Sequence, residues 1–441
     1  MSLGFAVVQL DVSVVNVAIK SIGTDLGGGV SALQWIVNAY TITFAAFILT
    51  AGAVADRIGA KRVFISGFVI FMLASAGCGV APSLGVLVGA RAVQGVGAAV
   101  LVPAALTLLN HAYTEPGARA RAIGLWLAGA SFALSGGPLV GGVLIATIGW
   151  RAIFFINVPV ALLGIYMTSR WAQETPAARD RGIDVPGQVV AVIALASLVA
   201  ATIEGGARGF GAPLVLAGFA VAAVSVALFV WIEAHSASPM LPLRMFNSRV
   251  FSTSAGIGLL INVAFYGLIF VLSLLFQREQ HLTPLQTGLA LAPTMIAVTV
   301  ANLLSGRISE LAGPRLSVAV GAAVVGAACL GLLGVDGSTS YGAMVVQLSC
   351  LGLGGGTVIP VITSELLGSA ERSRSGVAAG TLNTLRQTGS AIGVALFGSL
   401  VAGAFLSGFH AALAISAGLA FVIVALTPLL RGRREAARAA E

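Results

Sequence analysis

Long apolar runs alternate with short polar connections along almost the whole chain. A helix needs about 20 apolar residues to cross the hydrocarbon of a bilayer, and the sequence holds fourteen runs of this kind. We therefore predict an all-α integral membrane fold with fourteen transmembrane helices. The runs lie near residues 3–19, 33–55, 63–81, 84–109, 121–146, 152–170, 185–203, 212–232, 251–276, 286–306, 316–335, 340–365, 375–402 and 409–430.

The positive charges between these runs indicate how the chain is oriented. With the N-terminus inside, eighteen of the 24 Lys and Arg residues fall in inner segments, four fall in outer segments, and Arg91 and Arg386 fall within runs. Cytoplasmic loops carry an excess of Lys and Arg. We therefore expect a multi-pass protein of the inner (cytoplasmic) membrane with both termini in the cytoplasm. The outer charges are Lys20, Arg151, Arg208 and Arg278.

The composition agrees with lipid as the main solvent. Of the 441 residues, 58% are hydrophobic and 9% are charged, whereas soluble domains carry about 25% charged residues. The net charge of +8 is explained by the membrane orientation, so we expect no nucleic-acid partner. The first run begins beside Met1 without a basic segment or a small-residue cleavage site, which argues against a removed signal peptide.

Catalytic and metal-binding patterns are absent from the sequence. Cys78, Cys329 and Cys350 lie in apolar stretches without ligand spacing, which favours a packing role. The HExxH, GxSxG and GxxxxGK(S/T) motifs do not occur, so nothing indicates hydrolysis or nucleotide binding. We expect neither an enzyme nor a bound cofactor or metal.

Two sequence patterns occur once in each half of the chain. Residues 52–62 and 306–315 both read Gly, an acid four residues later, Gly after three more, and then a base. A Gly-x-Gly pair followed by Pro recurs at 95–103 and 352–360. Duplicated halves around a central pathway are a common transporter plan. We predict a six-helix bundle in residues 1–170, two linker helices in 171–250, a second six-helix bundle in 251–430 and a cytoplasmic tail in 431–441.

Asp11 is the only carboxylate in the middle of a run. An ionisable group at that depth is costly and usually faces a cavity or a partner. Because burial favours the neutral form of a carboxyl group, Asp11 could take up and release a proton near neutral pH, or bind a substrate cation. The alternative is a structural carboxylate locked to Arg91.

Arg91 lies inside the fourth run, beside Gln94. A buried guanidinium needs an acceptor, and Asp11 or the polar surroundings of the first run are the candidates. A charge pair that breaks on protonation would couple proton uptake to helix movement. The alternative is that Arg91 anchors the helices statically.

Other polar residues within the runs are candidates for lining a substrate cavity. Asn383, Arg386 and Gln387 are spaced to share one face of a helix. The pattern is weaker for the remaining candidates, which are Asn16, Gln34, Asn38, Tyr40, Gln94 and Asn262.

A third group of candidates concerns conformational change. Clustered Gly and Pro in the fifth run allow kinking and tight packing, which suits a helix that moves between two access states. The acid in each loop pattern could pair with a neighbouring helix end and hold one conformation, or it could simply be solvated. The candidates are Gly52, Asp56, Arg57, Gly59, Arg62, Gly129, Gly137, Pro138, Gly141, Gly142 and Glu310.

Taken in order, these motifs resemble the major facilitator superfamily, and specifically its fourteen-span drug:proton antiporter family. The resemblance covers essentially the whole chain. It departs at Lys20, where relatives usually have Pro, and before Leu3, where relatives have a longer lead-in. The segments that carry it are residues 10–18, 52–62, 91–97, 129–142, 149–159 and the stretch around Arg386.

The resemblance implies a monomeric exporter that exchanges protons for small amphipathic molecules, either drug-like compounds or secondary metabolites, cationic ones included. Asp11 would carry the proton while two six-helix halves rock about a mid-membrane cavity. The second half has no clear intramembrane carboxylate, so exchange of several protons is not expected. A symporter or importer of the same fold is one alternative, which the antiport-associated fifth-run motif and the two extra helices disfavour. A non-transporting membrane sensor is another.

Overall fold

The computed structural model describes residues 1–113, 115–176, 184–236, 239–370 and 375–430, and all of its regular elements are helical. The predicted tail 431–441 and the inner charges Arg179, Arg181, Arg372 and Arg374 lie outside these ranges. The first half holds α1 (Ser2–Leu26), α2 (Val30–Ile58), α3 (Ala60–Gly79), α4 (Leu84–Ala112), α5 (Pro116–Thr147), α6 (Ala152–Phe155) and α7 (Asn157–Trp171).

Two helices, α8 (Val185–Arg208) and α9 (Pro213–His235), follow the first half, and the short η1 (Leu243–Asn247) leads into the second half. The second half holds α10 (Arg249–Leu274), which η2 (Leu275–Glu279) extends, then α11 (Pro284–Ala312), α12 (Pro314–Gly331), α13 (Tyr341–Ser369), α14 (Ser375–Leu400), α15 (Phe405–Leu426) and η4 (Thr427–Leu429).

Each predicted run coincides with one helical segment, when α6 and α7 are taken together as the sixth. Within the described residues, thirteen segments are long and apolar enough to cross a membrane. The remaining one, α14, is long enough but more polar, because Asn383, Arg386 and Gln387 lie within it. The prediction of an all-α membrane fold with fourteen long helices is confirmed.

Equivalent glycines end the second helix of each half. Gly59, between α2 and α3, has φ = 100°, and Gly313, between α11 and α12, has φ = 82°. Backbone at positive φ strains residues with a Cβ, so the loop pattern needs Gly at this place twice. A Cβ on Gly59 would also lie 2.5 Å from Oε1 of Glu174. This shared geometry supports the internal repeat.

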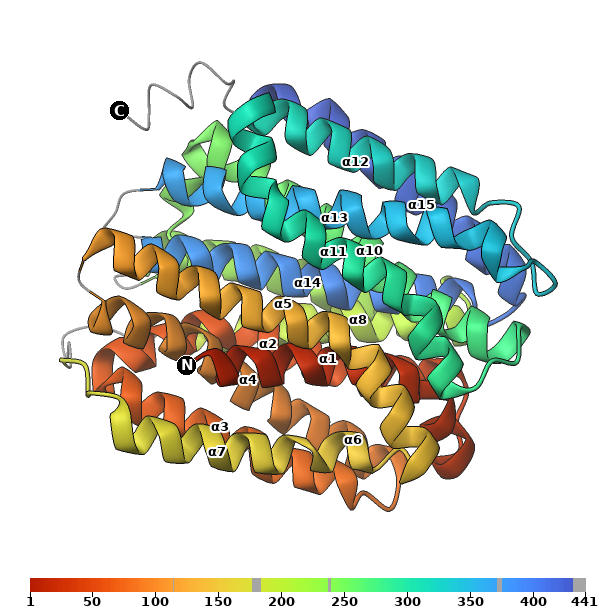
Figure 1. Ribbon diagram of the computed structural model, residues 1–441, viewed down its shortest axis with the longest axis horizontal. Coiled ribbons are helices and arrows are strands. Elements are labelled where there is room, and N and C mark those ends of the chain that lie inside the picture. Colours follow the sequence, from red (N-terminus) through yellow and green to blue (C-terminus); the bar gives the residue numbers. More distant parts are fainter. Residues whose placement is uncertain (114, 177–183, 237–238, 371–374, 431–441) are drawn as a thin grey trace.

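The long helices run side by side along one direction (Figure 1). The two halves meet through α2 against α14 and through α5 against α11. We call the line where α2 meets α14 the seam. Within each half, α1 packs on α5 and α10 packs on α14, so the helices that hold the polar candidates lie next to the junction between the halves.

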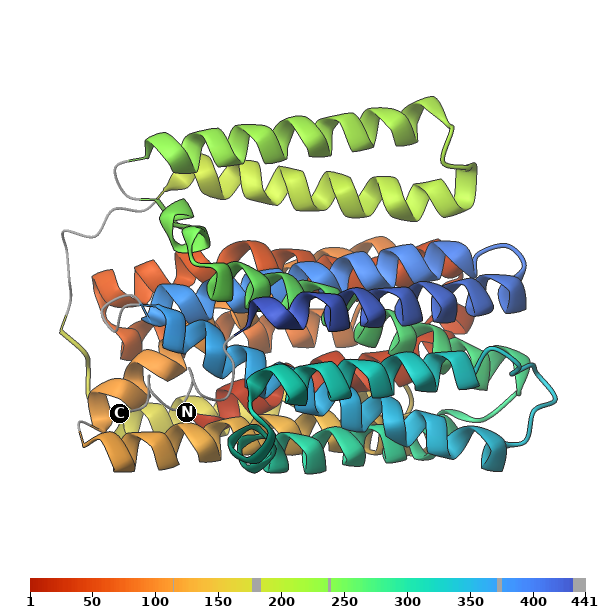
Figure 2. The same cartoon turned by 90° about the horizontal axis from the view of Figure 1, so that it is seen from above.

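The two extra helices form a layer beside the halves (Figure 2). Helix α8 packs on both α2 and α14 and therefore covers the seam, whereas α9 packs mainly on α8. Many apolar side chains of α9, such as Val224 and Trp231, are exposed. An apolar surface of this kind is stable in lipid and unstable in water.

Polar and close contacts attach α8 at its two ends. The amide of Gln188 donates to the carbonyl of Ala46 on α2 at 3.1 Å and accepts from the hydroxyl of Thr50. At the far end, a Cβ on Gly206 would lie 2.5 Å from the Cβ of Ser399 on α14. Helix α8 therefore has its closest attachments to α2 at one end and to α14 at the other.

The two ends of the bundle differ in charge. We call the end that holds the loop between α2 and α3 the basic end, and its described cations include Arg57, Lys61, Arg62, Arg170, Arg244, Arg249, Arg307 and Arg315. The opposite end holds Lys20, Arg151, Arg208 and Arg278. This is the charge split that the sequence predicted.

Candidate functional site

A fully buried ion pair joins α1 to α4. The side chains of Asp11 and Arg91 are 0% and 1% exposed, and Nη1 of Arg91 contacts Oδ2 of Asp11. The same nitrogen donates to Oε1 of Gln94 at 2.8 Å, and Nε of Arg91 donates to the carbonyl of Ile36 at 3.1 Å. The predicted pairing of Arg91 with Asp11 is present.

Neutral side chains complete the surroundings of the Asp11 carboxylate. Its Oδ1 accepts from Nε2 of Gln94 at 2.8 Å and from Nδ2 of Asn157 at 2.9 Å. Both amides also reach the hydroxyl of Ser75, which itself donates to the carbonyl of Phe154 at 2.9 Å. Asp11 therefore takes part in a polar network that ties together α1, α3, α4, α6 and α7.

Three side chains donate hydrogen bonds to the Asp11 carboxylate, and bonds between charged partners are the strongest kind. The guanidinium of Arg91 also lies 4.3 Å from the ring centre of Tyr40, an arrangement that stabilises a cation. Protonation of Asp11 would remove the counter-charge of Arg91 and weaken several of these bonds at once.

Glycines on α4 allow this network to form at short range. A Cβ on Gly95 would overlap the Tyr40 carbonyl and the Thr43 hydroxyl of α2, and one on Gly97 would lie 2.6 Å from the Phe71 nitrogen of α3. Because small residues let helix backbones approach closely, α4 lies against α2 and α3 at the level of the ion pair.

A large cavity opens between the two halves toward the basic end, with a volume of about 1670 Å³. Both halves contribute to its wall, through α1, α2, α4 and α5 on one side and α10, α11, α13 and α14 on the other. Most of the wall is apolar. The polar residues that line it are Gln9, Thr50, Asp56, Thr107, Asn110, Ser131, Asp184, Tyr266, Asn302, Thr363, Ser364, Asn383 and Arg386.

Contacts between the halves close the opposite end. The hydroxyl of Ser273 donates to the carbonyl of Asn16 at 2.6 Å, and Nζ of Lys20 donates to the carbonyl of Gln277. Where α2 meets α14, Nε2 of Gln34 donates to the carbonyl of Ala395 at 2.6 Å. The chain is therefore in a conformation that is open at the basic end and closed at the other.

Glycines of α5 and α11 make part of this closure. Gly137 and Gly141 face α1, where added Cβ atoms would meet Ser13 and Val14, and Gly142 faces Leu285 of α11 at 2.8 Å. A Cβ on Gly288 of α11 would overlap the carbonyl of Pro138. A Cβ on Gly129 would lie 3.7 Å from the Cβ of Ser2, an ordinary van der Waals contact. The predicted flexible run is thus a contact surface for both α1 and α11.

Two of the predicted cavity residues line the cavity, Asn383 and Arg386. Gln94 belongs to the polar network instead, and the ring of Tyr40 lies beside Arg91. The side chain of Gln34 bonds across the closed end, where Asn16 takes part through its backbone carbonyl while its amide bonds Val12 of its own helix.

The amide of Asn262 bonds the Gly258 carbonyl of its own helix, and neither Asn38 nor Gln387 belongs to the lining. In this conformation these side chains lie outside the lining of the cavity, and their role in substrate binding stays a prediction. Polarity located these side chains within helices, but the rotation of each helix decided which face they occupy.

The loop pattern of the first half is held by Glu174, which the sequence analysis did not select. Its carboxylate accepts from the backbone nitrogens of Lys61 at 2.9 Å and Arg62 at 3.3 Å, at the first turn of α3. An acid at a helix N-terminus is favourable. Nε of Arg62 also lies 3.6 Å from Glu174. Asp56 lines the cavity, whereas Arg57 and Glu310 are exposed.

Several lining residues were missed, among them Gln9, Trp126, Tyr266 and Asn302. Gln9 stands in an apolar run two residues before Asp11 and was open to the same argument as the selected residues. Trp126 and Tyr266 carry mostly apolar rings, so nothing in the pattern distinguished them from packing residues. Their position depends on which helices meet across the cavity.

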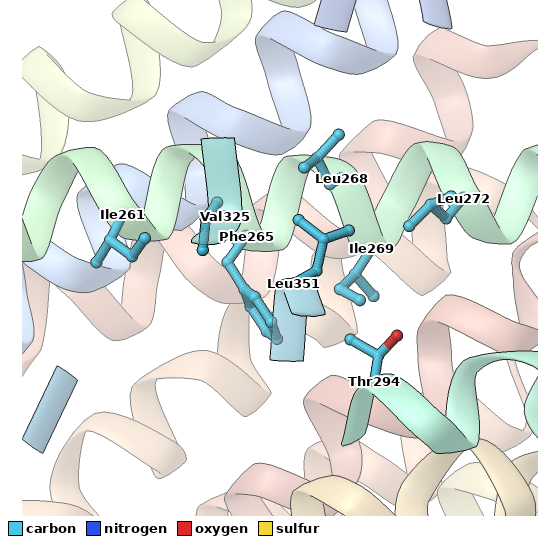
Figure 3. A pocket seen from close by; sticks show the side chains of 8 residues that line it. All are labelled: Ile261, Phe265, Leu268, Ile269, Leu272, Thr294, Val325 and Leu351. Atoms are coloured by element: carbon cyan, nitrogen blue, oxygen red, sulfur yellow. The ribbon is translucent and has the colours of Figure 1, made fainter. Parts of the chain in front are cut away.

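A second, very small pocket lies within the second half, between α10, α11, α12 and α13 (Figure 3). Its volume is about 10 Å³, and Thr294 supplies the polar side chain among otherwise apolar neighbours such as Phe265 and Leu351. A space of this size holds at most one water molecule. It is a packing gap and too small for a substrate.

Comparison with known proteins gives a consistent picture. The profile of the Major Facilitator Superfamily matches residues 1–394. A methylenomycin A resistance protein of Streptomyces coelicolor is 36% identical over 398 residues, covering 90% of this chain and 84% of that protein. The multidrug resistance protein Stp of Mycobacterium tuberculosis is 34% identical over 402 residues, covering 91% and 74%.

Among solved structures, the human organic anion transporter MFSD10 (TETRAN) aligns with a TM-score of 0.67. The alignment covers 96% of this chain and 98% of that one, at 17% sequence identity. At that identity the likeness shows the fold alone.

Proposed function

The chain belongs to the Major Facilitator Superfamily, and on that basis we propose that it is a proton-coupled antiporter that exports small amphipathic molecules. Its relatives named above are resistance proteins, and a third, from Streptomyces alboniger, is a puromycin resistance protein that is 32% identical over 402 residues. These names support drug-like compounds or secondary metabolites as substrates.

The orientation follows from the charges of the two ends. An excess of Lys and Arg marks the cytoplasmic side of a membrane protein, so the basic end faces the cytoplasm in the inner membrane. The cavity then opens to the cytoplasm, where an exporter collects its substrate. Rocking of the halves about the cavity would open the opposite end and release the substrate outside.

The buried Asp11–Arg91 pair is the observation that carries the proton-coupling proposal. It lies at membrane depth, where charged groups are costly and usually mark a functional site. It joins two helices of the first half. Asp11 does not line the cavity in the present conformation, so proton exchange takes place when the opposite end opens. Protonation would then loosen the network and favour the change of state.

An importer or symporter of the same fold remains the alternative for the direction of coupling. The close packing of Gly137, Gly141 and Gly142 between α1 and α11 supports the antiport assignment that the sequence motif implies. A non-transporting sensor would not need the proton, and loss of Asp11 would then leave its behaviour unchanged.

Transport into vesicles with an imposed pH gradient tests the proposal. The purified chain is reconstituted with an acidic lumen, and puromycin or methylenomycin A is added outside. We expect accumulation of at least one probe that a protonophore abolishes, together with loss of luminal protons. Accumulation only with an alkaline lumen would show symport, and no movement of any probe in either gradient would contradict transport of this substrate class.

Asp11→Asn tests whether Asp11 carries the proton, and it needs a second variant as a control because Asp11 is paired with Arg91. Removing one partner of a buried ion pair costs about 3–5 kcal/mol, because Arg91 would stay charged without a counter-ion. The double variant Asp11→Asn with Arg91→Gln removes both charges, so no buried charge is left without a partner. We expect both variants to lose gradient-driven accumulation, and unchanged accumulation in the double variant would refute the role of Asp11.

A further inference from the structure

Arg386 is a cation in the cavity wall that has no counter-ion among the described residues. It lies on α14 and lines the cavity. Within the described part of the chain it forms no ion pair, and its Nε is buried without a hydrogen-bond partner. A guanidinium in a mostly apolar wall is costly unless an acceptor reaches it. The described residues supply no counter-ion for it in this conformation.

The acids of the cavity lie far from Arg386. Asp56 and Asp184 are the acidic residues of the lining, and both stand near helix ends at the basic end. Asp184 accepts from the Gly187 nitrogen of α8 at 2.8 Å. Arg386 lies eleven residues into α14, which places it about 16 Å along the helix from that end. The deep part of the cavity therefore has a positive charge and the rim has the negative ones.

The neighbours of Arg386 in the wall are neutral. Asn383 stands one turn earlier on the same helix, and Tyr266 of α10 lies close enough for an electrostatic interaction. The side chain of Tyr266 also lies beside that of Gln9 of α1. The stem of Arg386 packs where α10 has Gly258, whose added Cβ would lie 3.5 Å from Cγ of Arg386. The side chain is thus positioned by packing, and its charged group is left for another partner.

A second unpaired donor lines the same cavity. Trp126 of α5 is 5% exposed, and its Nε1 has no acceptor among the described residues. Its ring stacks on Phe5 with centroids 4.5 Å apart. It lies ten residues into α5, about 15 Å from the basic end and so at a depth similar to that of Arg386. Indole and guanidinium groups can only donate hydrogen bonds.

We propose that the transported substrate carries a carboxylate or a similar anionic group, which Arg386 binds deep in the cavity while Trp126 and the apolar wall hold its ring or chain. This refines the proposed function by naming the substrate class, and it rests on the cavity being the substrate site. Guanidinium–carboxylate contacts are charge-assisted and can be bidentate. A cationic amphiphile would instead meet a charge of its own sign at Arg386.

Binding of three probes of matched shape to the full chain in lipid nanodiscs tests this assignment. The probes are 2-naphthoate, 2-naphthamide and 2-naphthylmethylammonium, and their binding is measured by equilibrium dialysis at pH 7. Excess chloride is present, so that any site without selectivity among anions is occupied by chloride. We expect naphthoate to bind at least about tenfold more tightly than naphthamide, and the ammonium probe to bind most weakly.

Variants at Arg386 assign the preference to this side chain. Arg386→Gln should bring the affinity for naphthoate to within about twofold of that for naphthamide and leave naphthamide unchanged, whereas Arg386→Lys should keep part of the preference. The matched control is Arg208→Gln, since Arg208 is an exposed arginine on α8 outside the cavity. It should bind all three probes like the native chain.

Two results would overturn the assignment. One is a native chain that binds naphthamide or the ammonium probe as tightly as naphthoate, which needs no variant and therefore no assumption about folding. The other is an Arg386→Gln chain, folded by its thermal transition, that keeps the full preference for naphthoate. No proton gradient is present in these binding measurements. Failure of proton-driven export would therefore not affect the binding result, and failure of the binding result would not affect the test of export.

Discussion

At the residue scale, the environment of Asp11 shows why a single carboxylate can be kept at membrane depth. Arg91 supplies the opposite charge, while Gln94 and Asn157 occupy the remaining oxygen with neutral donors. Neither residue of the pair lines the cavity in the present conformation. These donors come from α4 and α7, so the surroundings of Asp11 depend on how α1, α4 and α7 pack together.

Gly95 gives a direct test of that packing. A Cβ at this position would overlap the backbone of α2, so Gly95→Ala must push α4 away from α2 beside the ion pair. We expect a loss of about 1–3 kcal/mol of stability, seen as a lower thermal transition in detergent. Gly89→Ala on the same helix is the control, because its Cβ would meet nothing within 4 Å, and it should be neutral or stabilising. Equal transitions for the two variants would contradict this packing argument.

The sequence located the charged pair but not its neutral partners. Asp11 and Arg91 are conspicuous because charged residues inside apolar runs are rare and a buried charge needs a compensating partner. Asn157 stood out only as part of a motif, and Ser75 did not stand out at all, since a serine inside a membrane helix often bonds its own backbone. Which neutral side chains face the carboxylate depends on helix rotation, and one sequence does not give that rotation.

At the scale of the helices, hydrophobic length was enough to place every long segment, including the more polar α14. That helix packs closely against α10. Added Cβ atoms on Gly389 and Gly393 would overlap carbonyls of Leu259 and Val263 on α10, so the two backbones lie very close. The polar face of α14 is then turned toward the cavity, as Asn383 and Arg386 show. The sequence could predict the helix and its polar face, but not its partner.

Helix α8 is attached to the first half by Gln188, which leads to a prediction for this element. Gln188→Leu removes the bonds to Ala46 and Thr50, and interhelical hydrogen bonds in membrane proteins contribute about 0.6 kcal/mol on average, at most about 1.7. We expect the thermal transition to fall by a corresponding small amount. Ser197→Ala is the control, because Ser197 bonds carbonyls of its own helix. A Gln188 variant as stable as this control would show that α8 is held by apolar contacts alone.

At the scale of the whole molecule, the two halves close the opposite end through small residues that match across α5 and α11. Gly288→Leu should prevent this closure, because even a Cβ there overlaps the carbonyl of Pro138. The population should shift toward the conformation that is open at the opposite end. Labelling of a cysteine at Ser131, a lining residue, reports this shift when Cys78, Cys329 and Cys350 are replaced by Ala.

For Gly288→Leu we expect an impermeant thiol reagent to label that cysteine more slowly from the basic side and faster from the opposite side. The control is Gly306→Leu on the same helix, where an added Cβ would meet nothing within 4 Å and labelling should match the parent. If Gly288→Leu left both labelling rates unchanged, closure between α5 and α11 would not be what sets the equilibrium between the two conformations.

The size of the cavity has a consequence for how the solvent acts on the molecule. At about 30 Å³ per water molecule, its 1670 Å³ correspond to roughly 50 water molecules, which must leave when the basic end shuts. Polymers too large to enter the cavity lower the activity of water outside it. They therefore favour the conformation in which the basic end is closed and the cavity has lost its water. We therefore expect large polyethylene glycols to slow labelling at Ser131 from the basic side, while glycerol, which can enter, has little effect.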